Sequence, residues 1–361
     1  MSFRPSVNLD QRAGFSTWMV GLGGVGSVVA ARMAAPSLLL VDTWEPNVAA
    51  IRADGLSVSY PDARITRSLP ACTVSELGAG YADDYVPGVV LLAVKSYQTS
   101  EVIRAIVPYL RPNSVVVSLQ NGINEELLSQ VVGVERTIGA TSMLDGRLVA
   151  PGSAIQVKPA ATIVMGELDG RLTERLHTIQ TMLGRAADVQ LTTDIWSELW
   201  TKLVRNCMIN AVSAATNLPI GVVVRDLRLL DVAVLLGCEA AEVASARGIR
   251  LVDGNLFGES ASLYLTASVA NRSAVADAFR AAYEPFTSLR PSMLQDLDHG
   301  RPTEVGYMND YVVRKGSEVG VATPVNAAVV ALVRNRERGA PPTEPAALAE
   351  HVLNGAEQSA H

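Results

Sequence analysis

A glycine-rich stretch near the N-terminus limits the folds open to this chain. Gly21-Leu-Gly-Gly-Val-Gly26 matches G-x-G-x-x-G, with a short apolar strand at 18–20 before it and a helix-like run at 27–34 after it. Glycines there permit a tight turn, close approach of a pyrophosphate and close packing of helix on strand. The motif alone is weak, but this strand–helix context supports it. We therefore predict a dinucleotide-binding loop formed by Gly21, Gly23, Gly24, Val25 and Gly26.

A carboxylate follows at the spacing typical of such loops. Asp42 ends the apolar run 37–41, twenty-one residues after Gly21. A carboxylate there accepts hydrogen bonds from the adenosine ribose of NAD and repels a 2′-phosphate. Asp42 could instead be a helix cap or turn residue, and Arg52 could still reach a phosphate. The sequence thus favours NADH over NADPH without excluding NADPH.

Two further apolar runs continue the alternation of strand and helix. Residues 89–94 and 114–119 are typical of strands buried on both faces of a parallel sheet. Ligands bind beyond the carboxyl ends of such strands. Lys95, Gln98 and Asn121 follow these ends, so we predict that they meet the cofactor; each could also be an ordinary polar loop residue.

The pattern of elements predicts two domains. Strands become shorter from 137 to 190, where the sheet should close with a last helix at 171–183, and the chain is almost entirely helical afterwards. We expect an α/β domain at 1–190, a helical domain at 191–340 and a fraying tail at 341–361. The predicted helices of the second domain are 195–216, 227–247, 273–289, 307–319 and 326–338.

One of these helices carries an unusual polar row. Lys202, Asn206 and Asn210 are spaced i, i+4 and i+8, so they share one face. Trp196, Leu199, Leu203 and Cys207 form an adjacent apolar stripe with the same period. If that helix is buried, its ammonium and carboxamides need partners, which a polar ligand would supply. A solvated face is the alternative.

Composition excludes several classes of protein. The 361 residues are 48% hydrophobic and 18% charged with a formal net charge of -6, which gives no electrostatic reason for nucleic acid or an anionic membrane as partner. No apolar run approaches the roughly 18 residues of a membrane helix, and residues 1–17 lack the apolar core of a signal peptide. Cys72, Cys207 and Cys238 have no metal-ligand spacing. We expect free thiols, no metal and a cytoplasmic protein.

Several segments together resemble the ketopantoate reductase family over nearly the whole chain. They are the glycine motif 21–26, Lys95 with Gln98, Gln120-Asn-Gly122, Lys-Leu-Val-Arg-Asn-Cys-Met-Ile-Asn at 202–210, Asn-Leu-Pro at 217–219, Ser-Met-Leu-Gln-Asp at 292–296, Arg-Pro-Thr-Glu at 301–304 and Thr-Pro-Val-Asn at 323–326. Each segment is short, but their shared order and spacing make the resemblance specific.

The resemblance implies a Rossmann-type doubly wound sheet followed by an all-α domain. The family reduces a 2-oxo acid to the 2-hydroxy acid with a nicotinamide hydride, ketopantoate to (R)-pantoate, in pantothenate biosynthesis. Carried over by position, Lys202 would be the general acid and Glu304 would bond a hydroxyl or orient Lys202. Asn206, Asn210 and Ser292 would bind the substrate, while Lys95 and Asn121 would contact the nicotinamide end of the cofactor.

The chain also departs from the family pattern. Asp42 stands where NADPH-preferring members carry a basic or small residue, Gly306 and Asp310 alter a common run, and the stretch 249–291 is longer than usual. Alternatives are therefore a relative acting on another 2-oxo acid or an imine, or a dinucleotide-binding sensor without turnover. The helical domain could support a homodimer.

Overall fold

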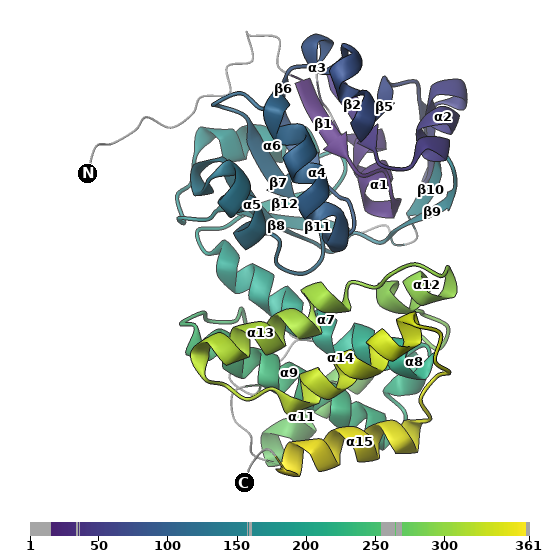
Figure 1. Cartoon of the computed structure of the whole chain (residues 1–361), viewed down its shortest axis with the longest axis vertical. Helices are drawn as coiled ribbons and strands as arrows, with labels where there is room; N and C mark the ends of the chain where they lie inside the picture. Colours follow the sequence, from purple (N-terminus) through teal and green to yellow (C-terminus); the bar gives the residue numbers. More distant parts are fainter. Residues whose placement is uncertain are drawn as a thin grey trace, which may run out of the picture. The chain divides into compact units, whose positions relative to one another are not determined.

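The chain divides into two compact units between Trp196 and Ser197, a few residues after the predicted boundary at 190. The computed structural model describes residues 16–33, 35, 37–156, 158, 161–253, 264 and 269–358. Part of the long stretch 249–291, residues 254–263 and 265–268, therefore lies outside the described residues. Figure 1 labels most helices and strands of both units.

The first unit is built on an eight-stranded sheet of order β12-β11-β8-β7-β6-β1-β2-β5 (Figure 1). Neighbouring strands of this sheet pair in parallel, except that β8 and β11 are antiparallel. The strands are β1 Ser16–Val20, β2 Leu38–Asp42, β5 Ala71–Thr73, β6 Pro87–Leu92, β7 Val115–Ser118, β8 Thr137–Ser142, β11 Thr162–Glu167 and β12 Asp188–Leu191. The chain order reverses between β1 and β6, where open α/β sheets bind ligands.

Helices cover both faces of this sheet. Successive strand residues enter opposite cores, with Met19 and Leu40 in one and Trp18 and Leu39 in the other. The helices are α1 Gly24–Arg32, α2 Glu45–Asp54, α3 Tyr81–Asp84, α4 Thr99–Ile106, α5 Glu125–Val132 and α6 Glu174–Leu183, with short 3₁₀ turns η1 Val74–Ala79, η2 Ser96–Gln98, η3 Val107–Tyr109 and η4 Val134–Arg136. The first core includes α1, α2 and α6, and the second includes α4 and α5. The predicted doubly wound domain is confirmed.

A second, four-stranded sheet differs from the prediction. It has the order β4-β3-β10-β9, formed by β3 Leu56–Ser59, β4 Arg64–Arg67, β9 Gly146–Ala150 and β10 Ser153–Gln156. We expected the strands after 137 to close the main sheet. Strands β8, β11 and β12 do so, but β10 pairs with β3 and β9 pairs with β10. Val58 and Ala154 of this second sheet extend the core around α1.

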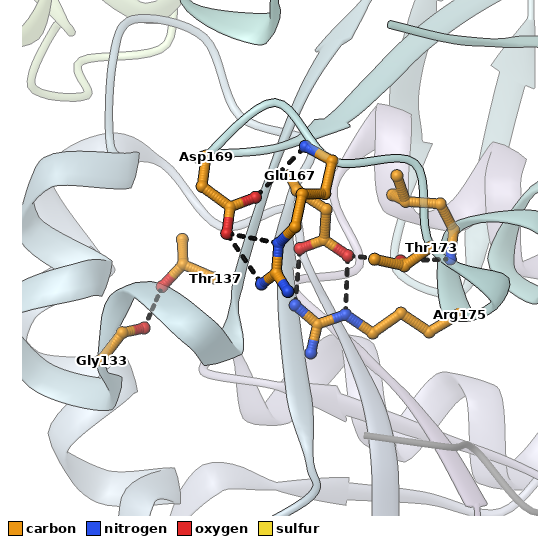
Figure 2. Close-up of polar contacts among 8 residues, drawn as sticks. Gly133, Thr137, Glu167, Asp169, Thr173 and Arg175 are labelled. Carbon is orange, nitrogen blue, oxygen red and sulfur yellow. Dashed lines mark hydrogen bonds and ion pairs between the residues drawn. The ribbon is translucent and has the colours of Figure 1, made fainter. Parts of the chain in front are cut away.

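A buried ion pair holds α6 on the main sheet (Figure 2). Glu167 ends β11, and its carboxylate accepts hydrogen bonds from Arg175 Nε at 2.7 Å and Nη2 at 2.5 Å. Thr173 donates to the same carboxylate at 2.6 Å. The two charged side chains are only 3% and 5% exposed, so neither could lose its partner without leaving a buried charge.

Every described element of the second unit is a helix (Figure 1). The helices are α7 Ile195–Thr216, whose first two residues belong to the first unit, α8 Ile220–Val223, α9 Leu227–Ala246, α11 Val269–Tyr283, α12 Ser292–Asp298, α13 Asn309–Val319, α14 Pro324–Glu337 and α15 Pro345–Gln358, with a 3₁₀ turn η5 at Val305–Tyr307. Helix α11 ends six residues before the predicted Leu289. Pro285 explains this end, because proline lacks the N–H and disfavours helical backbone at the residue before it.

The expected C-terminal tail is also corrected. Residues 345–358 form α15, and Leu348, Ala349 and Val352 on it are buried. Thr343 N donates to Ala215 O at 2.9 Å just before the helix begins. The Ala-, Pro- and Glu-rich composition suggested fraying, but the spacing of its apolar residues gives the helix a side that packs on α9 and α14.

A partly buried carboxyl fastens α14 to α9. Glu239 of α9 accepts hydrogen bonds from the backbone N–H groups of Val325 and Asn326, both at 2.9 Å, and from the Asn326 amide at 2.8 Å. It thereby caps the N-terminus of α14. Burial nevertheless raises the pKa of Glu239, although the donors oppose that shift.

This raised pKa makes a prediction for Glu239→Gln. A carboxyl whose pKa is higher in the folded than in the unfolded chain stabilises the fold fully below the unfolded value, near 4.3, and loses that stabilisation as pH rises through the folded value. We expect the Tm advantage of the parent over the variant to shrink as pH rises from about 4 to 7, measured by thermal melts. An advantage that grows with pH would mean that the three donors outweigh burial.

Candidate functional site

The glycine loop has the geometry that a bound pyrophosphate requires. Gly21 has φ +96°, and Gly26 packs so closely that a Cβ on it would lie 1.9 Å from Gly21 O. Around Gly23, no atom of a described residue other than its two chain neighbours lies within 4 Å of a Cβ position. Gly23 also caps the N-terminus of α1, where backbone N–H groups favour an anion. Protein atoms thus occupy the space beside Gly21 and Gly26, whereas the space beside Gly23, the middle glycine of the motif, is open.

A fourth glycine contact was not predicted from the sequence. Gly24 lies against Gly146 of β9, and a Cβ on Gly24 would be 2.0 Å from Gly146 O. The sequence showed Gly146 only as part of a Leu-Asp-Gly turn signal. The pairing could not be inferred from it, because the two glycines are 122 residues apart and Gly146 lies in a sheet that the pattern did not reveal. Val25 lies in the same first turn of α1 and is partly buried.

Asp42 is held rigidly at the end of β2. It is 7% exposed, and it accepts hydrogen bonds from Thr43 N at 2.7 Å, Leu22 N at 3.3 Å and the Asn47 amide at 2.7 Å. Trp44 N adds a fourth at 3.3 Å. Asp42 therefore makes the contacts of a turn residue, as the alternative interpretation expected. The same contacts hold its carboxylate in place beside the glycine loop.

Asn47 is a structural residue that sequence reasoning missed. Its amide donates to Leu22 O in the glycine loop as well as to Asp42, and its carbonyl oxygen accepts from Gly152 N at 2.7 Å. It is fully buried. One side chain thus ties the glycine loop, the predicted ribose carboxylate and the turn between β9 and β10 together.

The Arg52 side chain is bound by other residues of the first unit. Its guanidinium donates to Glu76 at 2.8 and 3.2 Å, to Ala71 O at 2.8 Å and to the Tyr81 hydroxyl at 3.1 Å. The Arg52 guanidinium and the Thr73 backbone N–H lower the pKa of Glu76 to about 2. Arg52 therefore serves the joint between α2, β5 and η1, and the sequence-based suggestion that it reaches a phosphate receives no support.

The loops after β6 and β7 are joined by side chains. Ser96 donates to Asn121 O at 2.8 Å, and the Asn124 amide donates to both Ser96 Oγ and Asn121 O. The Gln120 amide donates to Val94 O at 2.7 Å and to Thr99. Lys95 caps η2 at the head of this loop. Lys95 and Asn121 are thus on neighbouring loops, as predicted from the strand ends. Nothing in the sequence distinguishes Ser96 and Asn124 from ordinary polar loop residues.

Gln98 reaches further than predicted. Its amide donates to Thr43 Oγ1 at 3.1 Å, joining the loop after β6 to the loop after β2. Because β1 lies between those strands, this contact crosses the strand that carries the glycine loop. Gln98 therefore belongs with the Asp42 end of the site.

In the second unit, α7 has the bounds that the sequence predicted. Leu199, Leu203 and Cys207 of the apolar stripe are buried. Lys202 and Asn206 are half-buried on the polar row, and Asn210 is 4% exposed. The helix is therefore mostly enclosed, and the solvated-face alternative does not describe Asn210.

The polar row and the Ser292 segment come together. Asn210 Oδ1 accepts a hydrogen bond from Ser292 Oγ at 3.2 Å and lies 3.5 Å from Met293 N, while its amide donates to Asn206 O at 3.1 Å. Asn206 Nδ2 is buried and has no hydrogen-bond partner within the described parts of the chain. A buried amide without a partner is costly, and a ligand oxygen would satisfy it.

Glu304 is buried between Thr303 and η5. It is 3% exposed and precedes η5, while the neighbouring Thr303 donates through both its N–H and its hydroxyl to Glu337 of α14. Among the described residues, no group of His, Cys, Asp and Glu could hold a metal ion, and no helix is long and apolar enough to span a membrane.

Comparison with known proteins covers both units. Residues 18–170 match the family described as ketopantoate reductase PanE/ApbA, and residues 194–337 match its C-terminal domain. A 2-dehydropantoate 2-reductase from Pyrobaculum aerophilum is 30% identical over 259 residues, 72% of this chain and 79% of that protein. One from Archaeoglobus fulgidus is 29% identical over 253 residues, 70% of this chain and 77% of that protein.

Solved structures share the fold. A PanE/ApbA family ketopantoate reductase from Ralstonia eutropha JMP134 is similar with a TM-score of 0.73 and 25% identity, covering 90% of this chain and 98% of that one. A D-mandelate dehydrogenase solved with NADH and anilino(oxo)acetate has a TM-score of 0.76 and 20% identity, with 90% and 99% covered. The two family matches together span most of the sequence and both units, and the chain therefore belongs to the ketopantoate reductase family.

Proposed function

We propose that this protein, an NAD(P)-dependent oxidoreductase of the 2-dehydropantoate 2-reductase type, reduces the ketone of a 2-oxo acid to the 2-hydroxy acid, with ketopantoate as the first substrate to test. The observation that carries this proposal is the combination of an open Gly23 at the N-terminus of α1 with the polar row on α7. The first suits a dinucleotide and the second a polar substrate. Both lie in segments of the matched family.

The roles of the chain's own residues follow from their chemistry. A nicotinamide cofactor held at the glycine loop supplies the hydride. Lys202 polarises the substrate carbonyl as an ammonium and donates the proton to its oxygen. The unpaired Asn206 amide is available to a substrate oxygen, and Ser292, held by Asn210, binds the carboxylate. Glu304 bonds a substrate hydroxyl or orients Lys202, and Lys95 and Asn121 contact the nicotinamide end.

Turnover separates this proposal from its alternatives. Ketopantoate and a panel of other 2-oxo acids and imines are mixed with NADH or NADPH, and loss of the reduced nicotinamide is followed by absorbance. We expect oxidation that depends on the 2-oxo acid. Oxidation with a different acid or an imine alone would reassign the substrate, and binding without any turnover would indicate a sensor.

We further propose that NADH is the preferred cofactor. The Asp42 carboxylate is fixed by four donors, and Glu45 adds a second acid in the first turn of α2. The nearby Arg52 is engaged by Glu76. A 2′-phosphate would therefore meet negative charge without a free guanidinium from α2.

Asp42→Asn tests this preference while keeping the shape of the side chain. We expect KM for NADH to rise by about tenfold, because hydrogen bonds to a charged group are worth about 1.5–3 kcal/mol, with kcat nearly unchanged. The variant should discriminate less against NADPH than the parent does. Asp54→Asn, at the far end of α2, is the control. A parent that prefers NADPH would overturn the assignment.

We also propose a homodimer and a cytoplasmic location. Val222, Leu227 and Phe286 are exposed apolar side chains of the second unit, with Gly221 N bonded to Phe286 O, and they could supply a contact. Sedimentation of the purified protein tests the dimer. The three cysteines are unpaired, in keeping with a reducing compartment; fractionation of the producing cells tests the location.

A further inference from the structure

The Trp44 side chain is exposed and takes no part in the packing of a core. It is 44% exposed, whereas Trp18 and Trp200 are fully buried. Across the described residues, its indole has no aromatic neighbour, no arginine or lysine over its face and no hydrogen bond from its N–H. Single exposed apolar residues are common on proteins, so the exposure alone means little. The position of Trp44 beside the predicted cofactor site makes its exposure relevant.

The backbone of Trp44 is fixed beside the predicted ribose carboxylate. Its N–H bonds Asp42 Oδ1 at 3.3 Å, and its carbonyl accepts from Asn47 N at 3.0 Å and Val48 N at 3.3 Å as the cap of α2. Asp42 and Asn47 are themselves tied to the glycine loop. The exposed ring therefore projects from a rigid stem two residues after Asp42.

The loop after β6 approaches the same place. Gln98 donates to Thr43, the residue between Asp42 and Trp44, at 3.1 Å. Strand β1 and its glycine loop lie between the two loops joined by this bond. In doubly wound sheets, the adenosine half of a dinucleotide lies over this end of the sheet. Trp44 is thus the exposed aromatic residue at the edge of the space assigned to adenosine.

We infer that the Trp44 indole stacks on the adenine ring of the cofactor and is a determinant of its affinity. A purine presents a flat aromatic face, and stacking on an indole needs no charge. The neutral ring complements Asp42, which would take the ribose hydroxyls. This inference rests on the proposed nicotinamide cofactor and adds the residue that binds its base.

Titrations of the intact protein with ADP-ribose and with NADH test the inference. Trp44→Ala should raise Kd for both by about tenfold, while Trp44→Phe, which keeps a stacking face, should stay within about threefold of the parent. In turnover, Trp44→Ala should raise KM for NADH and leave kcat unchanged. Leu172→Ala, at another exposed apolar residue of the same unit, is the matched control and should change nothing.

Fluorescence supplies a second readout that a merely structural role would not produce. ADP-ribose should quench part of the tryptophan emission of the parent, and that part should be missing in Trp44→Phe. Equal Kd values for the parent and Trp44→Ala, or equal quenching in the parent and Trp44→Phe, would overturn the inference.

The inference and the proposed function can fail separately. Weaker ADP-ribose binding by Trp44→Ala would support the adenine contact even if no 2-oxo acid is reduced. Conversely, turnover with NADH that is indifferent to Trp44 would leave the reductase proposal standing and remove the stacking role. Thermal melts of both variants should match the parent, because the exposed ring contributes little to the core.

Discussion

Lys202→Ala is expected to lower kcat by about 10²-fold or more, with a smaller change in KM. A positioned general acid contributes roughly 10²- to 10⁴-fold, and alanine removes both the proton and the charge that polarises the carbonyl. Lys202 is half-buried on α7 in the same row as Asn206 and Asn210, so truncation should leave the buried stripe of the helix intact. The measurement is steady-state kinetics with ketopantoate or the best 2-oxo acid found.

Two further variants make this test specific. Lys202→Arg keeps the charge but places it on a group that does not release its proton near neutral pH, so kcat should remain well below that of the parent. Lys315→Ala, which loses a lysine ion pair with Glu318 on α13, should leave kcat unchanged. An effect of Lys202→Ala confined to KM would reassign Lys202 to substrate binding.

Alanine at neighbouring glycines should separate cofactor binding from folding. At Gly23 a Cβ meets no described atom of the protein, so Gly23→Ala should fold with an unchanged Tm. Where the pyrophosphate approaches, the methyl group would clash, and Kd for NADH should rise on the order of 10- to 100-fold. Calorimetric titration and thermal melts give the two quantities.

Gly24→Ala should behave in the opposite way. Its Cβ would lie 2.0 Å from the backbone oxygen of Gly146, which no side-chain rotation relieves. We expect a loss of about 3 kcal/mol or more in the free energy of unfolding, and a fall in Tm of roughly 10 °C. A stable Gly24→Ala protein, or a Gly23→Ala protein that binds NADH normally, would contradict the assigned geometry of this loop.

Local patterns carried much of the prediction. The strand–glycine–helix sequence placed β1 and α1, the apolar runs placed β6 and β7, and helical spacing gave the bounds of α7. Each of these elements depends mainly on residues close together in the sequence. Likewise, strand ends sufficed to bring Lys95 and Asn121 onto neighbouring loops.

Contacts between residues far apart in the sequence could not be predicted from the pattern of apolar residues and glycines. The pairing of β3 with β10 and the approach of Gly146 to Gly24 depend on which short strands meet, and no period encodes that choice. Asn47 looks like a helix residue, yet its amide joins three segments. The Ala-, Pro- and Glu-rich composition conceals helix α15, although the spacing of Leu348 and Val352 places both on its buried side.

The most direct test follows the hydride itself. NADH labelled with deuterium at the transferable position of C4 is incubated with the protein and a 2-oxo acid, and the product is analysed by mass spectrometry and NMR. We expect the parent to form a 2-hydroxy acid that carries a single deuterium, located on C2, and Lys202→Ala to form the same product at a much lower rate. Unlabelled product, or unchanged substrate across the whole panel with either cofactor, would contradict it.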